Sequence, residues 1–568
     1  MRRSLLQLAL ILGSTAPAAR ASGPADPILR LVPSDSGVTL AVEDLRDHAR
    51  EIGGSPLLAA LQDLPAARAW LASDGSKALA KAARDVEAAL RLPIGAIRDE
   101  LVGDAVVLAF QPGPAGKPEQ ARGLLLALPR DRALADRLMA ALNDAQIRSG
   151  ELLGVEARAR DKVRYSARNF RQADRPSEYY AQLEGGAFAW SNSEEMLLGV
   201  IDRKLSGGKG LGDDPAFLKV RKGLPERSVA SLFVNPRLVE RAMAEVPRPA
   251  KPADERVAAM LGRYVGAVEY AGASLQWRDG VFLHTHEAID PARLDPWLRR
   301  WLTGPSEPLT LAGQVPESAL AVVSVSIDPE AIGGALWELV PEADRPGLDN
   351  LRLALRGILM GRDPVTEILP RFGPGMLLTL GPGPRFPLVA ALSWKDRPDD
   401  DLTAPLDNAL RTALAFYALN PKRKATHHRV ETRTIGEARV TELTDGLRPL
   451  LGYRVDRGRV VLGNVPGEVA RFGVAPDPGL LGEVRAKYFP EAETFAVVDL
   501  GRLVREVRTI RGPIARRLAG RSGRPAEAVD GDLGQILALA DLFRAATFSS
   551  AAGPDPNAIH RSIGLIAR

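Results

Sequence analysis

The sequence predicts an α+β fold: two tandem pseudo-repeats, each an antiparallel sheet with helices packed on one face. Three observations predict it. Short apolar runs alternate with turn residues, helical stretches lie between them, and two parts of the chain resemble each other in the same order. Hydrophobic residues make up 45% of the 568 residues and charged residues 26%, which is typical of a globular protein.

Runs rich in Val, Leu, Phe and Ala predict the strands of the first half. They cover residues 38–42, 104–111, 122–128, 227–234, 266–277 and 280–288. Tight turns at Glu184-Gly185-Gly186, Arg278-Asp279-Gly280 and Asp456-Arg457-Gly458 predict hairpins, because glycine readily adopts the positive φ that these turns need. Strands joined by hairpins are antiparallel. Apolar residues at helical spacing predict helices over 76–92 and 131–145.

Four segments of the first half match four segments of the second half in the same order. The pairs are 32–42 with 315–325, 103–114 with 373–384, 181–192 with 453–464, and 224–239 with 489–504. Four collinear matches indicate a tandem duplication. We therefore predict a first α+β repeat at 22–303, a linker at 304–314 and a second α+β repeat at 315–568.

The N-terminus has the pattern of a secretory signal peptide over residues 1–21. Arg2 and Arg3 precede the apolar run 5–12, and Ala19-Arg20-Ala21 supplies a cleavage site. The run is too short to span a membrane, and no later run is long enough, so no transmembrane span is expected. We expect a periplasmic or secreted protein. Cleavage removes three arginines and lowers the net charge from +5 to +2, so the basic charge gives no reason to expect a nucleic-acid partner.

The absence of cysteine excludes disulfides, thiolate metal sites and a cysteine nucleophile. Aromatic residues make up only 5% of the chain, which is poor material for stacking on bases or sugars. Catalytic signatures are also missing. Ser206-Gly207-Gly208-Lys209 matches S-x-x-K, but that motif requires a helix and the two glycines favour a loop. No cofactor-binding motif is present, so no cofactor is expected.

Ser191-Asn192-Ser193-Glu194-Glu195 follows a predicted strand, and we interpret it as a helix N-cap followed by acids. This segment, the Val32-Pro33 opening of a strand and the Gly103-Asp104 pair before another strand resemble a group of large exported bacterial proteins. That group is known only as domains of unknown function and has no established activity. The resemblance therefore implies a compartment and a fold, and no reaction.

His284 and His286 are the strongest candidates for metal ligands. They lie two residues apart on a predicted strand, so both side chains project from one face, whereas Glu287 projects from the other. A metal site needs three or four ligands, and a third would have to come from another strand. His560 lies in the comparable last strand of the second half. The alternative is that these histidines have no ligand and belong to the sheet surface or its hydrogen bonds.

Arg502, Arg505, Arg508 and Arg511 are spaced three apart and form a stripe on a predicted helix, with apolar residues on its other side. Such a helix is a candidate site for anionic lipid, lipopolysaccharide or an acidic polymer. The alternative is an ordinary helix with a solvated basic face.

These patterns predict an exported soluble protein that binds or scaffolds in the cell envelope without enzymatic activity. Its partner would be an envelope protein or an anionic envelope component. Two other functions remain open: an envelope metal-dependent hydrolase that uses His284 and His286, and a periplasmic carrier of apolar or anionic amphiphiles.

Overall fold

The computed structural model describes residues 23–113, 117, 120–172, 174–237, 252–303, 310–326, 328–397, 399–419, 428–446, 448–474, 476, 479–490, 492, 494–552 and 557–568. The predicted signal peptide lies outside them. The chain forms two compact units. Unit 1 comprises the residues up to Gly54, together with 73–239 and 270–277, and unit 2 comprises 55–72, 240–269 and 278–568.

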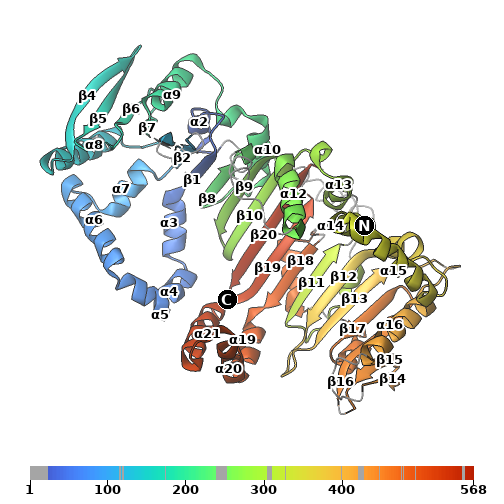
Figure 1. Ribbon diagram of the computed structural model, residues 1–568. Coiled ribbons are helices and arrows are strands. Elements are labelled where there is room, and N and C mark those ends of the chain that lie inside the picture. The colour runs from blue at the N-terminus through green and yellow to red at the C-terminus, as the bar shows by residue number, and fades with distance from the viewer. Residues whose placement is uncertain are drawn as a thin grey trace, which may run out of the picture. The chain divides into compact units, whose positions relative to one another are not determined.

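Unit 1 is built on an antiparallel sheet (Figure 1). Its strands lie in the order β9-β8-β1-β2-β3-β7-β6-β5-β4, and every neighbouring pair is antiparallel. Their bounds are β1 Val38–Glu43, β2 Ala105–Gln111, β3 Arg122–Ala127, β4 Leu152–Arg160, β5 Val163–Phe170, β6 Glu178–Gln182, β7 Phe188–Ser191, β8 Ala230–Val234 and β9 Val268–Trp277.

Helices of unit 1 pack both on one another and on the sheet. Helices α6, α7 and α8 pack on one another through a small core of Leu90, Ile97, Leu101, Leu134 and Ala135. Helix α9 packs on β6 and β7 and buries Met196, Leu197, Val200 and Ile201. The bounds are α2 Asp26–Leu29, α3 Leu45–Gly53, α6 Asp74–Leu90, α7 Ile94–Leu101, α8 Arg132–Arg148, α9 Glu194–Ser206 and α10 Pro215–Gly223.

The strands of unit 2 are also antiparallel. Their order is β10-β20-β19-β18-β11-β12-β13-β17-β16-β15-β14. The bounds are β10 Gly280–Ile289, β11 Ala321–Ser326, β12 Phe372–Leu380, β13 Leu388–Trp394, β14 Arg429–Ile435, β15 Ala438–Thr444, β16 Pro449–Asp456, β17 Arg459–Gly463, β18 Thr494–Asp499, β19 Phe543–Ala552 and β20 Ala558–Ala567.

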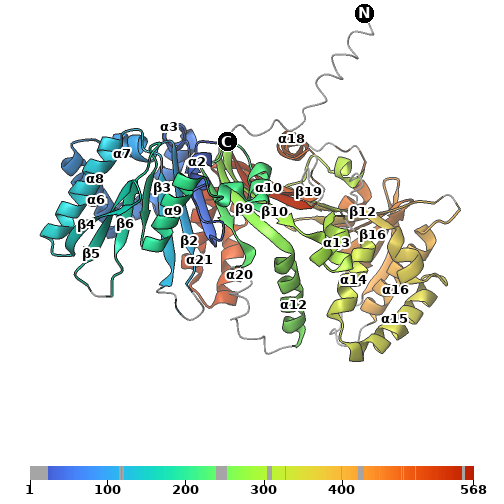
Figure 2. The ribbon, with the colours of Figure 1, turned by 90° about the horizontal axis from the view of Figure 1, so that it is seen from above.

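Helices cover both faces of the unit 2 sheet, which adds a layer to the predicted single helical face. Val461 packs with residues of α17 and α18, whereas its neighbours Val460 and Leu462 pack with residues of α15 and α16. Figure 2 shows α16 and α18 on opposite sides of the strands. The bounds are α4 Pro56–Asp63, α5 Pro65–Leu71, α12 Pro252–Ala267, α13 Pro296–Thr303, α14 Pro329–Leu339, α15 Arg345–Ile358, α16 Thr403–Ala418, α17 Pro466–Arg471, α18 Gly479–Tyr488, α19 Leu500–Thr509, α20 Arg511–Ser522 and α21 Ala526–Ala540.

Short helical turns complete the described elements. They lie at Leu211–Asp213, Pro291–Arg293, Thr310–Gln314, Glu342–Asp344, Pro364–Ile368 and Leu369–Arg371.

The pairing pattern of β1 to β9 recurs strand for strand in β11 to β19. In each set the first strand pairs with the second and the eighth, and the third pairs with the seventh. The α+β class is thus confirmed, and both halves have the same strand order. Descent of the halves from one duplicated unit stays a prediction.

The compact units do not divide the chain at the predicted linker 304–314. Strand β10, from the end of the first half, pairs along its length with β20 and therefore belongs to unit 2. Within the described part of the linker, Leu311 is buried in the core of unit 2 beside Val315. Leu311 therefore anchors the described part of the linker in this core.

Most local sequence signals are found where they were expected. Gly185, Gly186 and Gly458 adopt positive φ in their turns, but Gly280, which was expected to do the same, does not. Ser193 caps α9 by accepting a hydrogen bond from the Met196 amide. The prediction for 76–92 holds as a helix, but its amphipathic face is mostly solvated, because Leu90 is buried while Leu79 is 66% exposed.

Candidate functional sites

The two candidate metal ligands lie in a row of aromatic and imidazole rings in unit 2. His286 stands directly opposite His560 across the β10–β20 pair, and His284 stands opposite Ser562. The ring centroids are 5.7 Å apart for His284 and His560, and 6.1 Å apart for His286 and His560. The ring of Phe282 continues the row 6.0 Å from His284. The prediction that His284 and His286 share a face is confirmed.

Burial favours the neutral forms of His284 and His560. His286 is only 2% exposed. Loss of solvent, together with the charge of His560, lowers the pKa of His284 to about 4, and burial also lowers the pKa of His560. Both ring nitrogens of His284 are buried without a hydrogen-bond partner among the described residues. The protonated form of His284 would therefore be poorly stabilised.

The row does not form a metal site in the described part of the chain, where no three His, Cys, Asp or Glu side chains are arranged to hold an ion. Glu287 projects from the opposite face, as predicted. There it accepts hydrogen bonds from Tyr264 of α12 and from Nη1 of Arg561, the latter at 2.6 Å. This acid therefore ties α12 to the sheet and is not available to the histidines.

The predicted arginine stripe lies on α19, with Arg511 at the start of α20, and three of its four members bind within the protein. Arg502 donates to the carbonyl of Glu317 at 2.7 Å, and Arg508 pairs with Asp541 at 2.9 Å. Arg511 makes a two-pronged contact with Asp530. Arg505 is exposed. Three of the four arginines therefore join neighbouring elements. Only Arg505 faces solvent without a contact to another described residue that would give it a structural role.

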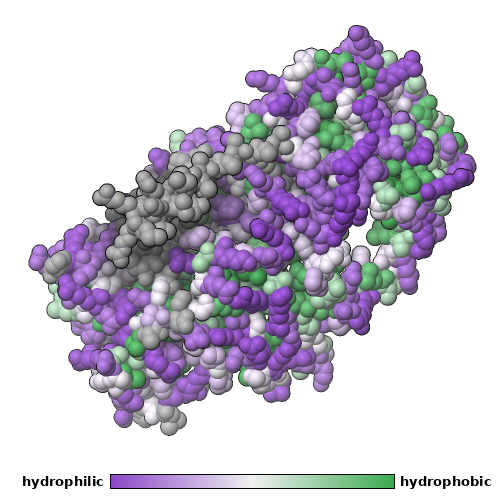
Figure 3. All heavy atoms as spheres, turned by 180° about the vertical axis from the view of Figure 1, so that it is seen from behind, coloured by the Kyte–Doolittle hydropathy of each residue, from purple (hydrophilic) through white to green (hydrophobic). Residues whose placement is uncertain are grey.

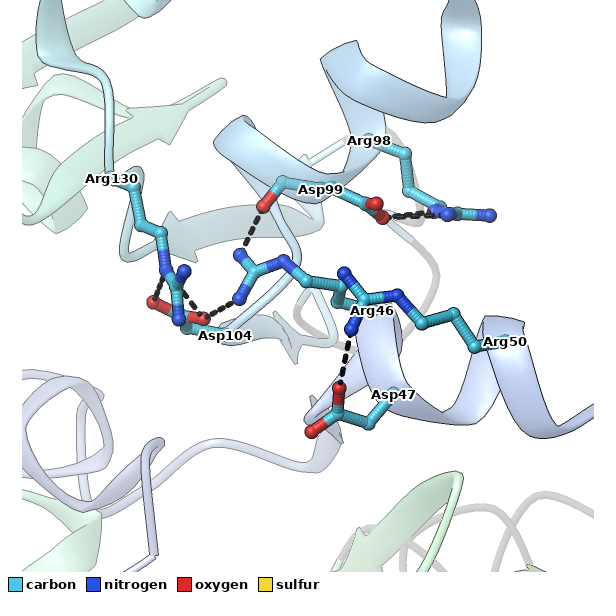
Figure 4. A network of polar contacts seen from close by, with 7 residues as sticks. All are labelled: Arg46, Asp47, Arg50, Arg98, Asp99, Asp104 and Arg130. Carbon is cyan, nitrogen blue, oxygen red and sulfur yellow. Dashed lines mark hydrogen bonds and ion pairs between the residues drawn. The ribbon is translucent and has the colours of Figure 1, made fainter.

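The Gly103-Asp104 pair organises a polar network at the base of α3 and α7 (Figure 4). Asp104 accepts from Nε of Arg130 at 2.9 Å and lies 3.1 Å from Nη1 of Arg46. Arg46 is almost fully buried and also donates to the carbonyl of Asp99. A side chain on Gly103 would overlap that carbonyl and the Arg46 guanidinium. All these charges are paired, so this motif is structural.

Exposed apolar side chains gather in separate groups on the molecular surface. Figure 3 shows one face, where green hydrophobic residues lie between purple hydrophilic ones. One group with a hollowed shape lies on the unit 1 sheet, over β1, β2, β3 and β7. It is a groove of about 430 Å³, with Val38, Leu40, Leu108, Phe110, Leu125 and Trp190 among its walls and Glu178, Ser191 and Asn192 at its polar end.

Strand register explains why these apolar side chains share the groove. Leu40 lies opposite Leu108, Leu108 opposite Leu125, and Leu125 opposite Trp190. Opposed residues of an antiparallel pair project from the same face. The result is an apolar row across four strands, in which Leu108 is 44% exposed and the neighbouring Phe110 is 42% exposed.

Helices cover one end of the corresponding row in the second half. There the matching row runs through Leu378, Ala390 and Leu462. Leu355 of α15 and Leu406 of α16 pack in one cluster with Leu462. In unit 1, α6 and α7 bury their apolar residues against α8. The groove therefore exists because the helices of the first half pack on one another and leave these strands open.

The sequence interpretation missed this groove. A signal for it is present in residues 105–110, which are apolar at every position. A strand with one solvated face normally alternates apolar and polar residues. Residues 105–110 therefore indicate that both faces of β2 have an apolar environment or an apolar ligand.

No protein-family model, no curated protein and no solved structure matches this chain. Among the described helices, none has the length and apolar character needed to cross a bilayer.

Proposed function

We propose that this chain is an exported binding protein of the cell envelope that holds an apolar or amphiphilic ligand in the groove of unit 1. The observation that supports the proposal is the open apolar row from Leu40 to Trp190, whereas the Leu462 end of the matching row in the second half packs against α15 and α16. The predicted signal peptide supports the envelope as the compartment.

The size and lining of the groove support a small ligand with a long apolar part. Its volume of about 430 Å³ lies within the range of small-molecule sites. Covering a Leu or Phe side chain fully contributes about 1.5–3 kcal/mol, so completing the burial of the half-exposed Leu108 and Phe110 contributes roughly half of that for each. The apolar row therefore supplies favourable free energy to any ligand that fits it.

Polar groups at one end of the groove favour an amphiphile over a purely apolar ligand. Glu178, Ser191 and Asn192 line that end. Asn192 already bonds the backbone of β3, accepting from the Gly123 amide at 2.7 Å. Ser191 donates to the Gly123 carbonyl at 2.7 Å. Ser191 is only 2% exposed, so Asn192 and Glu178, which pairs with Arg168, form the polar rim where the headgroup of an amphiphile would lie.

Binding of the fluorescent apolar probe N-phenyl-1-naphthylamine tests the groove. The double variant Leu108→Thr/Phe110→Thr should weaken probe binding at least tenfold, because it removes two apolar walls while threonine keeps strand propensity. The matched control Leu153→Thr/Val155→Thr alters two exposed apolar positions of β4, outside the groove. It should bind the probe like the unchanged protein.

Native mass spectrometry of the purified protein provides an independent measurement. We expect a co-purifying amphiphile that is lost in the Leu108→Thr/Phe110→Thr variant. Equal probe binding by both double variants would overturn the proposal. Co-purification of a protein partner that depends on Leu108 and Phe110, without any amphiphile, would support scaffolding instead.

A further inference from the structure

Helices α20 and α21 form a hairpin, and their facing sides pack together. Ala515, Ala519 and Val529 make its core. Two ion pairs also stabilise the hairpin: Arg511 contacts Asp530 at 2.6 Å, and Arg524 contacts Asp532 at 2.7 Å. These contacts use two arginines and two acids of the hairpin, so its outward surface depends on the remaining side chains.

Three arginines of α20 face outward. Arg516, Arg517 and Arg521 are exposed and make no hydrogen bond or ion pair with the residues that the structure describes. Arg517 and Arg521 are four residues apart and share one side of the helix. Two exposed acids, Glu527 and Asp532, lie on α21, and Asp532 is paired with Arg524. The outward surface of the hairpin is therefore positive.

Large apolar side chains are exposed on the same hairpin. Leu518 of α20 is 44% exposed, and Ile536 and Leu539 of α21 are 62% and 43% exposed. Ile536 and Leu539 are three residues apart and so share one side of α21. A helical hairpin that exposes arginines together with Leu and Ile has the composition of helices that lie in the interface of a bilayer.

We propose that the α20–α21 hairpin docks on a bilayer that carries anionic phosphate headgroups. Guanidinium groups bind phosphate through paired hydrogen bonds, and the apolar side chains enter the region beneath the headgroups. A nucleic acid would satisfy the arginines but not Leu518, Ile536 and Leu539. Residues 500–540 also contain no aromatic side chain on which a base could stack.

This surface is distinct from the groove of unit 1 and from the predicted stripe. Arg508 and Arg511 of that stripe are held by Asp541 and Asp530. Docking through α20 therefore goes beyond ligand binding, since it brings the protein to a membrane surface that its helices do not cross.

Co-sedimentation with vesicles tests the docking. The experiment uses the exported form of the protein, without residues 1–21, because an apolar signal sequence would itself bind lipid. We expect binding to vesicles that contain phosphatidylglycerol, weak binding to vesicles of phosphatidylcholine alone, and a decline in binding as salt rises.

The variant Arg517→Glu/Arg521→Glu should weaken binding by at least about 30-fold, because each basic side chain near an anionic surface contributes about fivefold. Arg84→Glu/Arg148→Glu is the matched control, with the same charge change at two exposed arginines of unit 1. It should bind nearly as the unchanged protein does. Ile536→Ser/Leu539→Ser should weaken the binding that persists at high salt.

Three outcomes would overturn the proposal. They are equal binding to both kinds of vesicle, equal loss in the two charge-reversal variants, and preferential binding to RNA over phosphatidylglycerol vesicles. Circular dichroism of each variant separates loss of docking from loss of folding.

Discussion

His286 lies directly opposite His560 in the antiparallel pair of β10 and β20, although 274 positions separate them in the sequence. His284 also contacts the His560 ring, at a centroid distance of 5.7 Å. The pairing thus gathers three of the six histidines of the chain on one buried sheet face. Because burial disfavours their charged forms, this face makes the folded protein sensitive to acid.

Stability should fall as the pH decreases from about 6.5 to about 4. The folded protein holds His284 neutral down to a pKa of about 4, whereas an unperturbed histidine has a pKa of 6.5. The unfolded chain therefore binds more protons in this window, and acid favours unfolding. At pH 5 the expected loss from His284 is about 2 kcal/mol relative to neutral pH.

Urea unfolding at both pH values measures this loss. His284→Phe should reduce the pH dependence, because phenylalanine fits a row of stacked rings and does not titrate. Thr285→Val, on the opposite face of β10, is the control and should leave the pH dependence unchanged. An identical pH dependence in His284→Phe and the unchanged protein would contradict the prediction.

Gly103→Ala should destabilise the protein by about 1–3 kcal/mol, because the added methyl group overlaps the Asp99 carbonyl and the buried Arg46 guanidinium. Gly95→Ala is the matched control, since its methyl group meets no atom within 4 Å and it lies inside α7. It should be neutral or stabilise by up to about 1 kcal/mol. Thermal unfolding of both variants gives the comparison, and equal effects would refute the steric argument.

Asn192→Ala should cost about 2 kcal/mol of unfolding free energy, and Asn464→Ala about 1 kcal/mol. Asn192 accepts from the Gly123 amide at 2.7 Å, and Asn464 accepts from the Leu388 amide at 2.8 Å, at the same point of the repeated strand pattern. Asn192 also donates to the Ala121 carbonyl at 3.0 Å, whereas Asn464 makes no second side-chain bond with the described residues. Urea denaturation of the two variants measures both costs, and equal costs would show that the second bond of Asn192 contributes nothing.

Arg505→Glu and Arg508→Glu should differ although both reverse a charge of the same helix. Arg508 pairs with Asp541, which also binds Arg568, so its reversal places two acids together and costs about 1 kcal/mol. Arg505 is exposed, and its reversal should change stability by less than about 0.5 kcal/mol. Chemical denaturation measures the free energy of unfolding of both variants. Equal losses would show that Arg505 also makes a structural contact.

Much of the candidate chemistry depended on neighbours that the sequence does not identify. Arg168 lies on a strand and is 1% exposed, with Asn143, Gln146 and Glu178 around its guanidinium. Its counterpart in the strand register of the second half is Leu443, in an apolar cluster with Leu414 and Tyr453. Alternation along a strand shows which residues share a face, but it does not show that a buried arginine has partners on a distant helix.

The sequence by itself determined the local structure: the strands, the glycine turns, the Ser193 cap and the matching order of the two halves. These features depend on residues within one or two turns of each other, and their signals are therefore present in short windows. Tertiary structure alone decided that His560 stands opposite His286, that Asp541 and Asp530 pair with two arginines of the predicted stripe, and that the apolar row of β1, β2, β3 and β7 stays open. Each of these outcomes depends on strand register or on helix packing between segments far apart in the chain. Register and packing result from many weak contacts summed over the whole fold, and no short window of sequence contains that sum.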